Sequence, residues 1–140
     1  MEQMGFICTL LEITEVDYFF NYDFDYSKEF SNKLMYQFMH ELKVDSDTEN
    51  LIINLSIRYM AEEERLVQNT VRVVYNIPNV SDVVAIEGNK IQALQPKLLN
   101  KLLMTTIDIA RGFLMKNLSQ TPLRQFVFPL VEVDLFRKHK

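Results

Sequence analysis

The feature that most constrains this chain is a strict alternation of apolar and polar side chains across its first half. Every second residue from Leu51 to Tyr59 is apolar, and the polar residues Asn54, Ser56 and Arg58 alternate with them. Apolar residues also recur on odd positions from Val67 to Ile77, where Pro78 follows. Side chains two apart share one face of a β-strand, so both runs predict strands with one buried face. Pro78 cannot donate to a ladder, and the second strand should end there.

An aromatic row precedes these strands. Between Glu12 and Tyr26 the even positions carry Tyr18, Phe20, Tyr22, Phe24 and Tyr26. As one strand face, this row would extend roughly 27 Å at ~3.4 Å per residue, which is more than one helix covers. We expect its middle in the core, and its ends at an interface or in a groove for extended polypeptide. The seven Met residues favour a surface that adapts to variable partners.

The strands follow one another without an intervening helix. A further alternating run covers residues 36–44, polar residues 45–50 predict a turn, and residues 61–65 predict a charged hairpin connection. Consecutive strands of this kind predict a four-stranded antiparallel meander. The stretch Phe30–Met35 leaves two interpretations open, a loop or a bulged strand edge.

The second half predicts one long helix that begins at Pro96. Apolar residues at helical spacing cover more than half of its circumference, so we expect the sheet on one side and a second copy of the chain on the other. The candidate interface of that homo-oligomer, a dimer or a tetramer, is Leu98, Leu102, Thr105 and Ile109. Gly112 predicts an end, a bend or a close backbone approach. Residues 126–129 predict an extended piece, and residues 133–140 a short final helix.

Composition excludes several classes of protein. With 140 residues, 48% hydrophobic and 24% charged, the chain predicts one folded domain and not a disordered segment. A net charge of −4 gives no reason to expect nucleic-acid binding. Cys8 is the only cysteine, no run approaches ~18 apolar residues, and the first residues lack a signal-peptide pattern. We therefore expect a cytoplasmic protein without direct membrane insertion.

A search for chemistry finds no catalytic constellation. The sequence lacks a glycine-rich phosphate loop, a Cys-x-x-Cys pair and a His-Glu-x-x-His motif. His40 predicts a partly buried strand residue with a hydrogen bond, with a ligand or general base as the alternative. We expect no catalytic residue, no metal and no cofactor. The carboxylates of Asp17, Asp23 and Asp25 predict either a docking surface for a basic partner or an ordinary solvated face.

Three short segments resemble the SecB family of protein-export chaperones. Val84-Ala85-Ile86-Glu87-Gly88 resembles the family's Gly-Ile-Glu-Gly segment, and Ile109-Ala110-Arg111-Gly112 resembles the end of its long helix. Residues 126–136 resemble its proline-containing close, which ends in Leu-Phe. The stretch from Phe113 to Gln125 is longer than the family's corresponding link.

The resemblance implies a single SecB-like domain over residues 1–140, of α+β class, with a sheet, a long helix on one face and a short C-terminal helix. It also implies a dimer of dimers whose long helices meet, and apolar grooves that bind unfolded polypeptide clients. The groove candidates on this sequence are Tyr59, Tyr75, Ile77, Val83, Phe126, Phe128 and Phe136. In the family an acidic sheet surface docks the SecA motor, and Asp17, Asp23 and Asp25 are the nearest candidates here. Some members serve a toxin–antitoxin pair instead, and none has an ATP site.

Three functions follow as hypotheses. The first is an ATP-independent holdase for unfolded polypeptides, for export or for a toxin–antitoxin pair. The second is a non-catalytic interaction module of the same fold with one specific partner. The third is a small-ligand binder that uses the aromatic face as a pocket. An enzyme is not expected.

Overall fold

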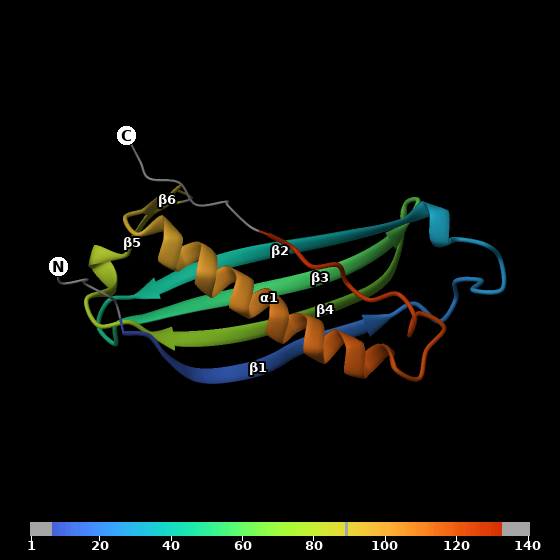
Figure 1. Ribbon diagram of the computed structural model, residues 1–140, viewed down its shortest axis with the longest axis horizontal. Coiled ribbons are helices and arrows are strands. Elements are labelled where there is room, and N and C mark those ends of the chain that lie inside the picture. Colours follow the sequence, from blue (N-terminus) through green and yellow to red (C-terminus); the bar gives the residue numbers. More distant parts are fainter. Residues whose placement is uncertain (1–6, 89, 133–140) are drawn as a thin grey trace.

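A four-stranded antiparallel sheet with one long helix on it forms the body of the molecule (Figure 1). The computed structural model describes residues 7–88 and 90–132. The elements are β1 Thr9–Phe20, β2 Leu34–Asp45, β3 Asn50–Ala61, β4 Glu64–Asn76, β5 Val84–Glu87, β6 Lys90–Ala93 and α1 Pro96–Leu118, with single 3-10 turns at Ser31–Lys33 and Val80–Asp82. The predicted fold class is confirmed: an antiparallel sheet of four strands precedes a long helix that packs on one of its faces.

The strand order β1-β4-β3-β2 corrects the predicted meander at its first strand. Strands β2, β3 and β4 follow one another through hairpins, as expected. Strand β1 pairs with β4 and not with β2, so the connection over residues 21–30 crosses from one edge of the sheet to the other (Figure 1). The two free edges of the sheet are therefore β1 and β2.

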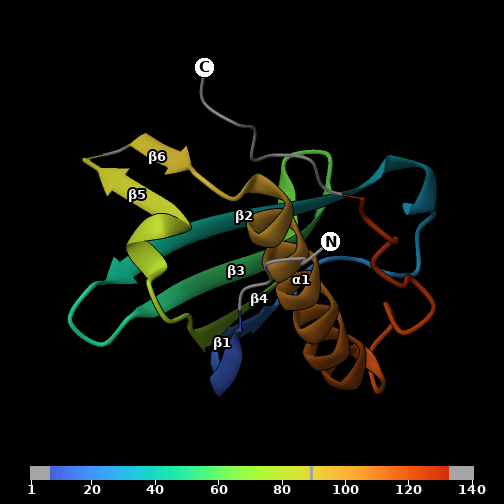
Figure 2. The same cartoon turned by 60° about the vertical axis from the view of Figure 1, so that its left-hand side comes forward.

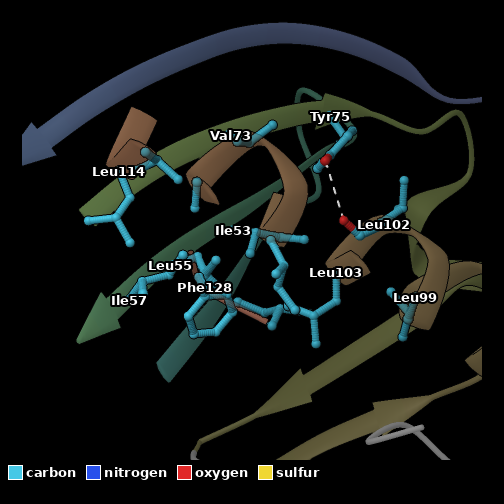
Figure 3. Close-up of a cluster of buried hydrophobic side chains, with 14 of the residues drawn as sticks. Ile53, Leu55, Ile57, Val73, Tyr75, Leu99, Leu102, Leu103, Leu114 and Phe128 are labelled. Carbon is cyan, nitrogen blue, oxygen red and sulfur yellow. Dashed lines mark hydrogen bonds between the residues drawn. The ribbon is translucent and has the colours of Figure 1, made fainter. Parts of the chain in front are cut away.

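The face that α1 covers, called here the inner face, is an apolar core. The alternate residues of β3 from Leu51 to Ala61 are at most 4% exposed, which confirms the alternation as a burial pattern. Figure 3 shows three of these side chains, Ile53, Leu55 and Ile57, in one cluster with Leu99, Leu103 and Leu114 of the helix. The Tyr75 hydroxyl lies 2.9 Å from the Thr106 hydroxyl and 3.4 Å from the Leu102 carbonyl, so the polar groups buried there have partners.

The aromatic row does not form one strand face, which corrects that expectation. Strand β1 ends at Phe20, because the Asn21 side-chain oxygen accepts the backbone N–H groups of Asp23 and Phe24 and turns the chain. The rings of Phe24, Tyr26 and Phe30 then pack on one another with centroids 5.0–5.7 Å apart. Tyr22 points to solvent. The aromatic residues after Phe20 therefore lie in a loop, although their alternation predicted a strand.

Three local expectations have clear outcomes. Helix α1 continues through Gly112 to Leu118, and a Cβ at Gly112 would meet nothing within 4 Å, so the helix does not end there and no backbone approaches closely. The stretch Phe30–Met35 is a 3-10 turn followed by the first residues of β2. The predicted final helix over residues 133–140 lies outside the described residues.

Candidate functional site

A groove of about 860 Å³ is lined by residues of the edge strand β2 and of the small hairpin β5–β6. Figure 2 shows this hairpin beside one end of β2. Its apolar lining comes from both walls and consists of Leu42, Val44, Val84, Ala85, Ile86 and Ile91. Among residues 7–88 and 90–132, strand β2 has a ladder partner, β3, on one side only, and β5 pairs with β6 in a separate sheet. The groove thus combines an unpaired strand edge with apolar side chains, which is the arrangement that extended peptides recognise.

The β5–β6 hairpin, which forms one wall of the groove, is fixed by backbone hydrogen bonds, a glycine turn and buried side chains. The Val83 carbonyl accepts the backbone N–H groups of Leu94 and Gln95 at 2.9 and 3.0 Å, which closes the base of the hairpin. Gly88 turns it with a φ of 60°, a conformation that suits glycine. The buried side chains of Val83, Val84 and Ala93 join the hairpin to the main core.

The charges at the rim of the groove are few and partly paired. Glu41 and Lys43 of β2 form a salt bridge of 3.3 Å. Burial lowers the pKa of His40 below its usual value, because the partly buried site disfavours the imidazolium ion. The lining at this part of β2 therefore combines the apolar side chains of Leu42 and Val44 with His40 and the paired Glu41 and Lys43.

The inner face already binds one extended segment, residues 126–129 of the chain itself. The Tyr59 hydroxyl donates to the Phe126 carbonyl at 2.6 Å. Arg111 donates from Nε to the Phe128 carbonyl at 3.0 Å and from Nη2 to the Pro129 carbonyl at 2.8 Å. This segment runs back beside α1 across β2 and β3 (Figure 1). Side chains of the sheet and helix therefore hold extended backbone through its carbonyl groups.

The predicted client-binding residues are core residues in this chain. Tyr59, Tyr75, Ile77, Val83 and Phe128 are buried, Phe126 is partly buried, and Phe136 lies outside the described residues. Tyr59 meets the Phe126 backbone, whereas Tyr75 packs under α1. None of the described six lines the β2 groove. Their role in client binding stays a prediction, and it requires that a client displace what now covers them.

Sequence reasoning missed the groove itself. The β5–β6 hairpin was not predicted, although the Val84–Gly88 motif lies in it. Ile86 and Ile91 are paired across this hairpin, and their recurrence around Gly88 was the available signal.

The predicted oligomer interface is divided by the structure. All four residues belong to α1: Leu102 is buried, Leu98 and Ile109 are partly buried, and Thr105 is exposed. A larger exposed apolar surface follows the free strand β1, at Ile7, Leu10, Leu11, Ile13 and Val16. The interface remains a prediction, and β1 is a further surface that a second copy could cover.

The three predicted docking carboxylates are not on one strand face. Asp17 lies on β1 opposite Thr70, on the face away from α1. Asp23 and Asp25 lie in the loop after β1, where they line a separate hollow of about 360 Å³. Hydrogen bonds from Ser27 lower the pKa of Asp25. Docking of a partner by these residues stays a prediction.

The described residues contain neither a metal-ligand cluster nor a membrane-spanning helix. Among them, no group of three or more His, Cys, Asp and Glu side chains is placed to hold a metal ion. No helix in the described part of the chain is long and apolar enough to cross a bilayer.

The four-stranded antiparallel sheet and the long helix on its inner face match the fold of a solved SecB-like structure. The SecB-like chaperone Rv1957 of Mycobacterium tuberculosis, in complex with a ChAD peptide from the antitoxin Rv1956 HigA1, matches with a TM-score of 0.54. The match covers 89% of this chain and 90% of that chain at 9% sequence identity, so the likeness concerns the fold. No family model and no curated protein matches the sequence.

Proposed function

We propose that this protein is an ATP-independent holdase that binds unfolded polypeptides, either for export or for a toxin–antitoxin pair. The observation that carries the proposal is the apolar groove beside the unpaired edge of β2. Main-chain hydrogen bonds to a strand edge are independent of client sequence. Burial of client side chains then contributes roughly 25 cal/mol per Å². Neither step uses a nucleotide, a metal or a covalent intermediate.

The alternative is an interaction module that has one specific partner. The mycobacterial SecB-like chaperone was solved with an antitoxin peptide, which favours a toxin–antitoxin partner over a general role. Breadth of binding separates the two functions: a holdase binds many unfolded chains, and a module binds one. A SecA-like motor belongs to the export version of the proposal.

The proposal includes a cytoplasmic homo-oligomer, a dimer or a tetramer. The exposed apolar side chains of β1 and the partly buried Leu98 and Ile109 on α1 support self-association, because such surfaces are unfavourable in water. Sedimentation of the wild type and of an Ile13→Asp variant tests it. A smaller particle for the variant is expected, and a wild-type monomer contradicts self-association.

The test of the proposed function is binding to a permanently unfolded, reduced and alkylated polypeptide, beside the same polypeptide in its native form. We expect micromolar or tighter binding to the unfolded form alone. Ile91→Asp should weaken it about fivefold or more, because Ile91 lines the groove and is 39% exposed. Leu94→Asp is the matched control, since Leu94 is 37% exposed and lies outside the groove lining.

Each outcome decides between the functions. No binding of either form would remove the general holdase and leave the single-partner module. Equal weakening by both variants would place the binding site outside the groove.

A further inference from the structure

The sheet face away from α1, called here the outer face, carries an unusual group of side chains at one end. The register of the strands sets Met35, Met60 and Arg65 in one row. The next row contains Arg58, Gln68 and Phe19. Together these six residues form what we call the outer patch. Helix α1 packs on the opposite face, so the patch and the helix lie on different sides of the sheet (Figure 1).

Two guanidinium groups in the outer patch converge on one oxygen atom. Arg58 Nε donates to Gln68 Oε1 at 3.0 Å, and Arg65 Nη1 donates to the same atom at 3.2 Å. The Arg65 guanidinium also lies over the Phe19 ring, 4.2 Å from its centroid, which fixes its plane. The Gln68 side-chain oxygen therefore lies where a carboxylate oxygen would accept hydrogen bonds from both guanidinium groups.

The two arginines have no carboxylate partner within 4.0 Å among the described residues. Asp17, on the same face, lies opposite Thr70 in the next row. Glu41 pairs with Lys43, and Glu62 pairs with Lys33. Glu64 lines the acidic hollow at the turn of the sheet. Two neighbouring like charges on a neutral amide are unfavourable, and an anion between them relieves the repulsion.

Apolar side chains surround this cationic pair. Met35 is 52% exposed and Phe19 is 38% exposed, and Met60 lies directly opposite Met35 on the neighbouring strand. Methionine is flexible and polarisable, so it adapts to different apolar surfaces. A ligand complementary to the outer patch has a carboxylate for the guanidinium groups and apolar groups for Met35, Met60 and Phe19.

We propose that the outer patch binds a protein segment in which acidic side chains stand beside apolar ones. Charge complementarity and the exposed methionines together select this class of partner. A nucleic acid fits less well, because its affinity depends on neutralising many phosphates, and the chain has a net charge of −4. The patch lies on the face opposite α1, away from the groove lining, so this partner and an unfolded client bind to separate surfaces.

The experiment measures fluorescence anisotropy of a labelled probe peptide made of Asp, Leu and Ser residues. Its twin has Asn in place of every Asp. The tested variant is R58Q/R65Q, and the charge-matched control is K97Q/K101Q, which removes two positive charges from the exposed side of α1. We expect the wild type and the control to bind the Asp peptide. The tested variant and the Asn twin should each weaken binding about tenfold or more.

A second readout separates this site from the groove. R58Q/R65Q should bind the permanently unfolded polypeptide as tightly as the wild type does, and added salt should weaken the Asp peptide more than the unfolded client. Absence of Asp-peptide binding, or equal affinity for the Asn twin, overturns the proposal without touching the holdase. Loss of both ligands in R58Q/R65Q also overturns it, because the two surfaces would then be one. Displacement of the peptide by oligo-dT at equal concentration overturns the assignment to a protein partner.

Discussion

Inner-face and outer-face residues alternate along each strand of the sheet, but different physical requirements set the residue types on the two faces. On the inner face of β3, Ile53, Leu55 and Ile57 are buried under α1. On the outer face, Asn54, Ser56 and Arg58 are partly exposed, and the last two bond to side chains of the neighbouring strand β4. The inner residues are fixed by the requirement to exclude water, whereas the outer ones are free to match a partner. Recognition can therefore change on one face without altering the fold.

The largest expected effect comes from a substitution in the core of the inner face. Leu103→Ala should lower the free energy of unfolding by about 2–5 kcal/mol, because Leu103 is fully buried and its removal leaves a cavity. Met104→Ala, at the next position but exposed, should change it by about 0.5 kcal/mol or less. Urea unfolding of both variants measures the difference. Similar values for the two would contradict the assignment of the inner face.

Arg111→Ala should have the next largest effect, a loss of about 2 kcal/mol. Its partly buried side chain, which also pairs with Asp108, donates to the carbonyl groups of Phe128 and Pro129, and charged donors contribute more than neutral ones. Amide hydrogen exchange should also become faster at residues 126–131. Arg124→Ala, which removes an exposed arginine two residues before this segment, is the control. Unchanged exchange in Arg111→Ala would show that packing alone holds the segment.

Deleting one hydroxyl from each face sharpens the comparison. Tyr59→Phe removes the donor to the Phe126 carbonyl in a buried site and should lower the unfolding free energy by about 1 kcal/mol. Ser56→Ala removes a hydroxyl that lies 2.6 Å from Thr70 Oγ1 on the partly exposed outer face, where water can replace it. The second change should be no more than about half of the first. Thermal melts of the two variants suffice, and a larger loss in Ser56→Ala would reverse the ranking.

The smallest effect concerns pH. Burial lowers the pKa of His40, so as the pH falls below about 6.5 the unfolded chain takes up a proton before the folded chain does. Stability at neutral pH should therefore decrease on acidification and level off once folded His40 itself titrates. The same groove is also lined by the charged residues Glu41, Lys43 and Glu87, which are the same in the wild type and in the His40 variant. Unfolding measured from pH 7.5 to 5 in the wild type and in His40→Gln isolates the contribution, which the variant should lack.

Much of the fold was predictable because burial is periodic. Alternation in β3 and β4 and the helical period after Pro96 predicted these elements with nearly their observed bounds. The place of β1 was not predictable, since pairing with β4 is a long-range choice and the turn after Phe20 depends on the side chain of Asn21. Strand periodicity says which face is apolar, and it does not say which neighbour a strand selects.

The candidate site was less predictable than the fold. Large apolar residues such as Tyr75 and Ile77 were natural candidates for client contact, yet the same hydrophobicity buries them under α1. The groove depends on a short hairpin whose two four-residue strands are below the length at which alternation is distinctive. The outer patch depends on strand register, which sets Arg58 and Arg65 beside Gln68 although the sequence separates them by seven residues.

The separate sheet formed by β5 and β6 has a mechanical consequence for the groove. In the part of the chain that the structure describes, no ladder hydrogen bond joins this hairpin to β2, so the two walls of the groove are linked by side-chain packing and by the short connections on either side of the hairpin. The distance between the hairpin and β2 can therefore increase without the loss of a ladder hydrogen bond between these two elements. For the proposed client binding, a wider groove would admit segments with small and with bulky side chains, while the main sheet keeps its register.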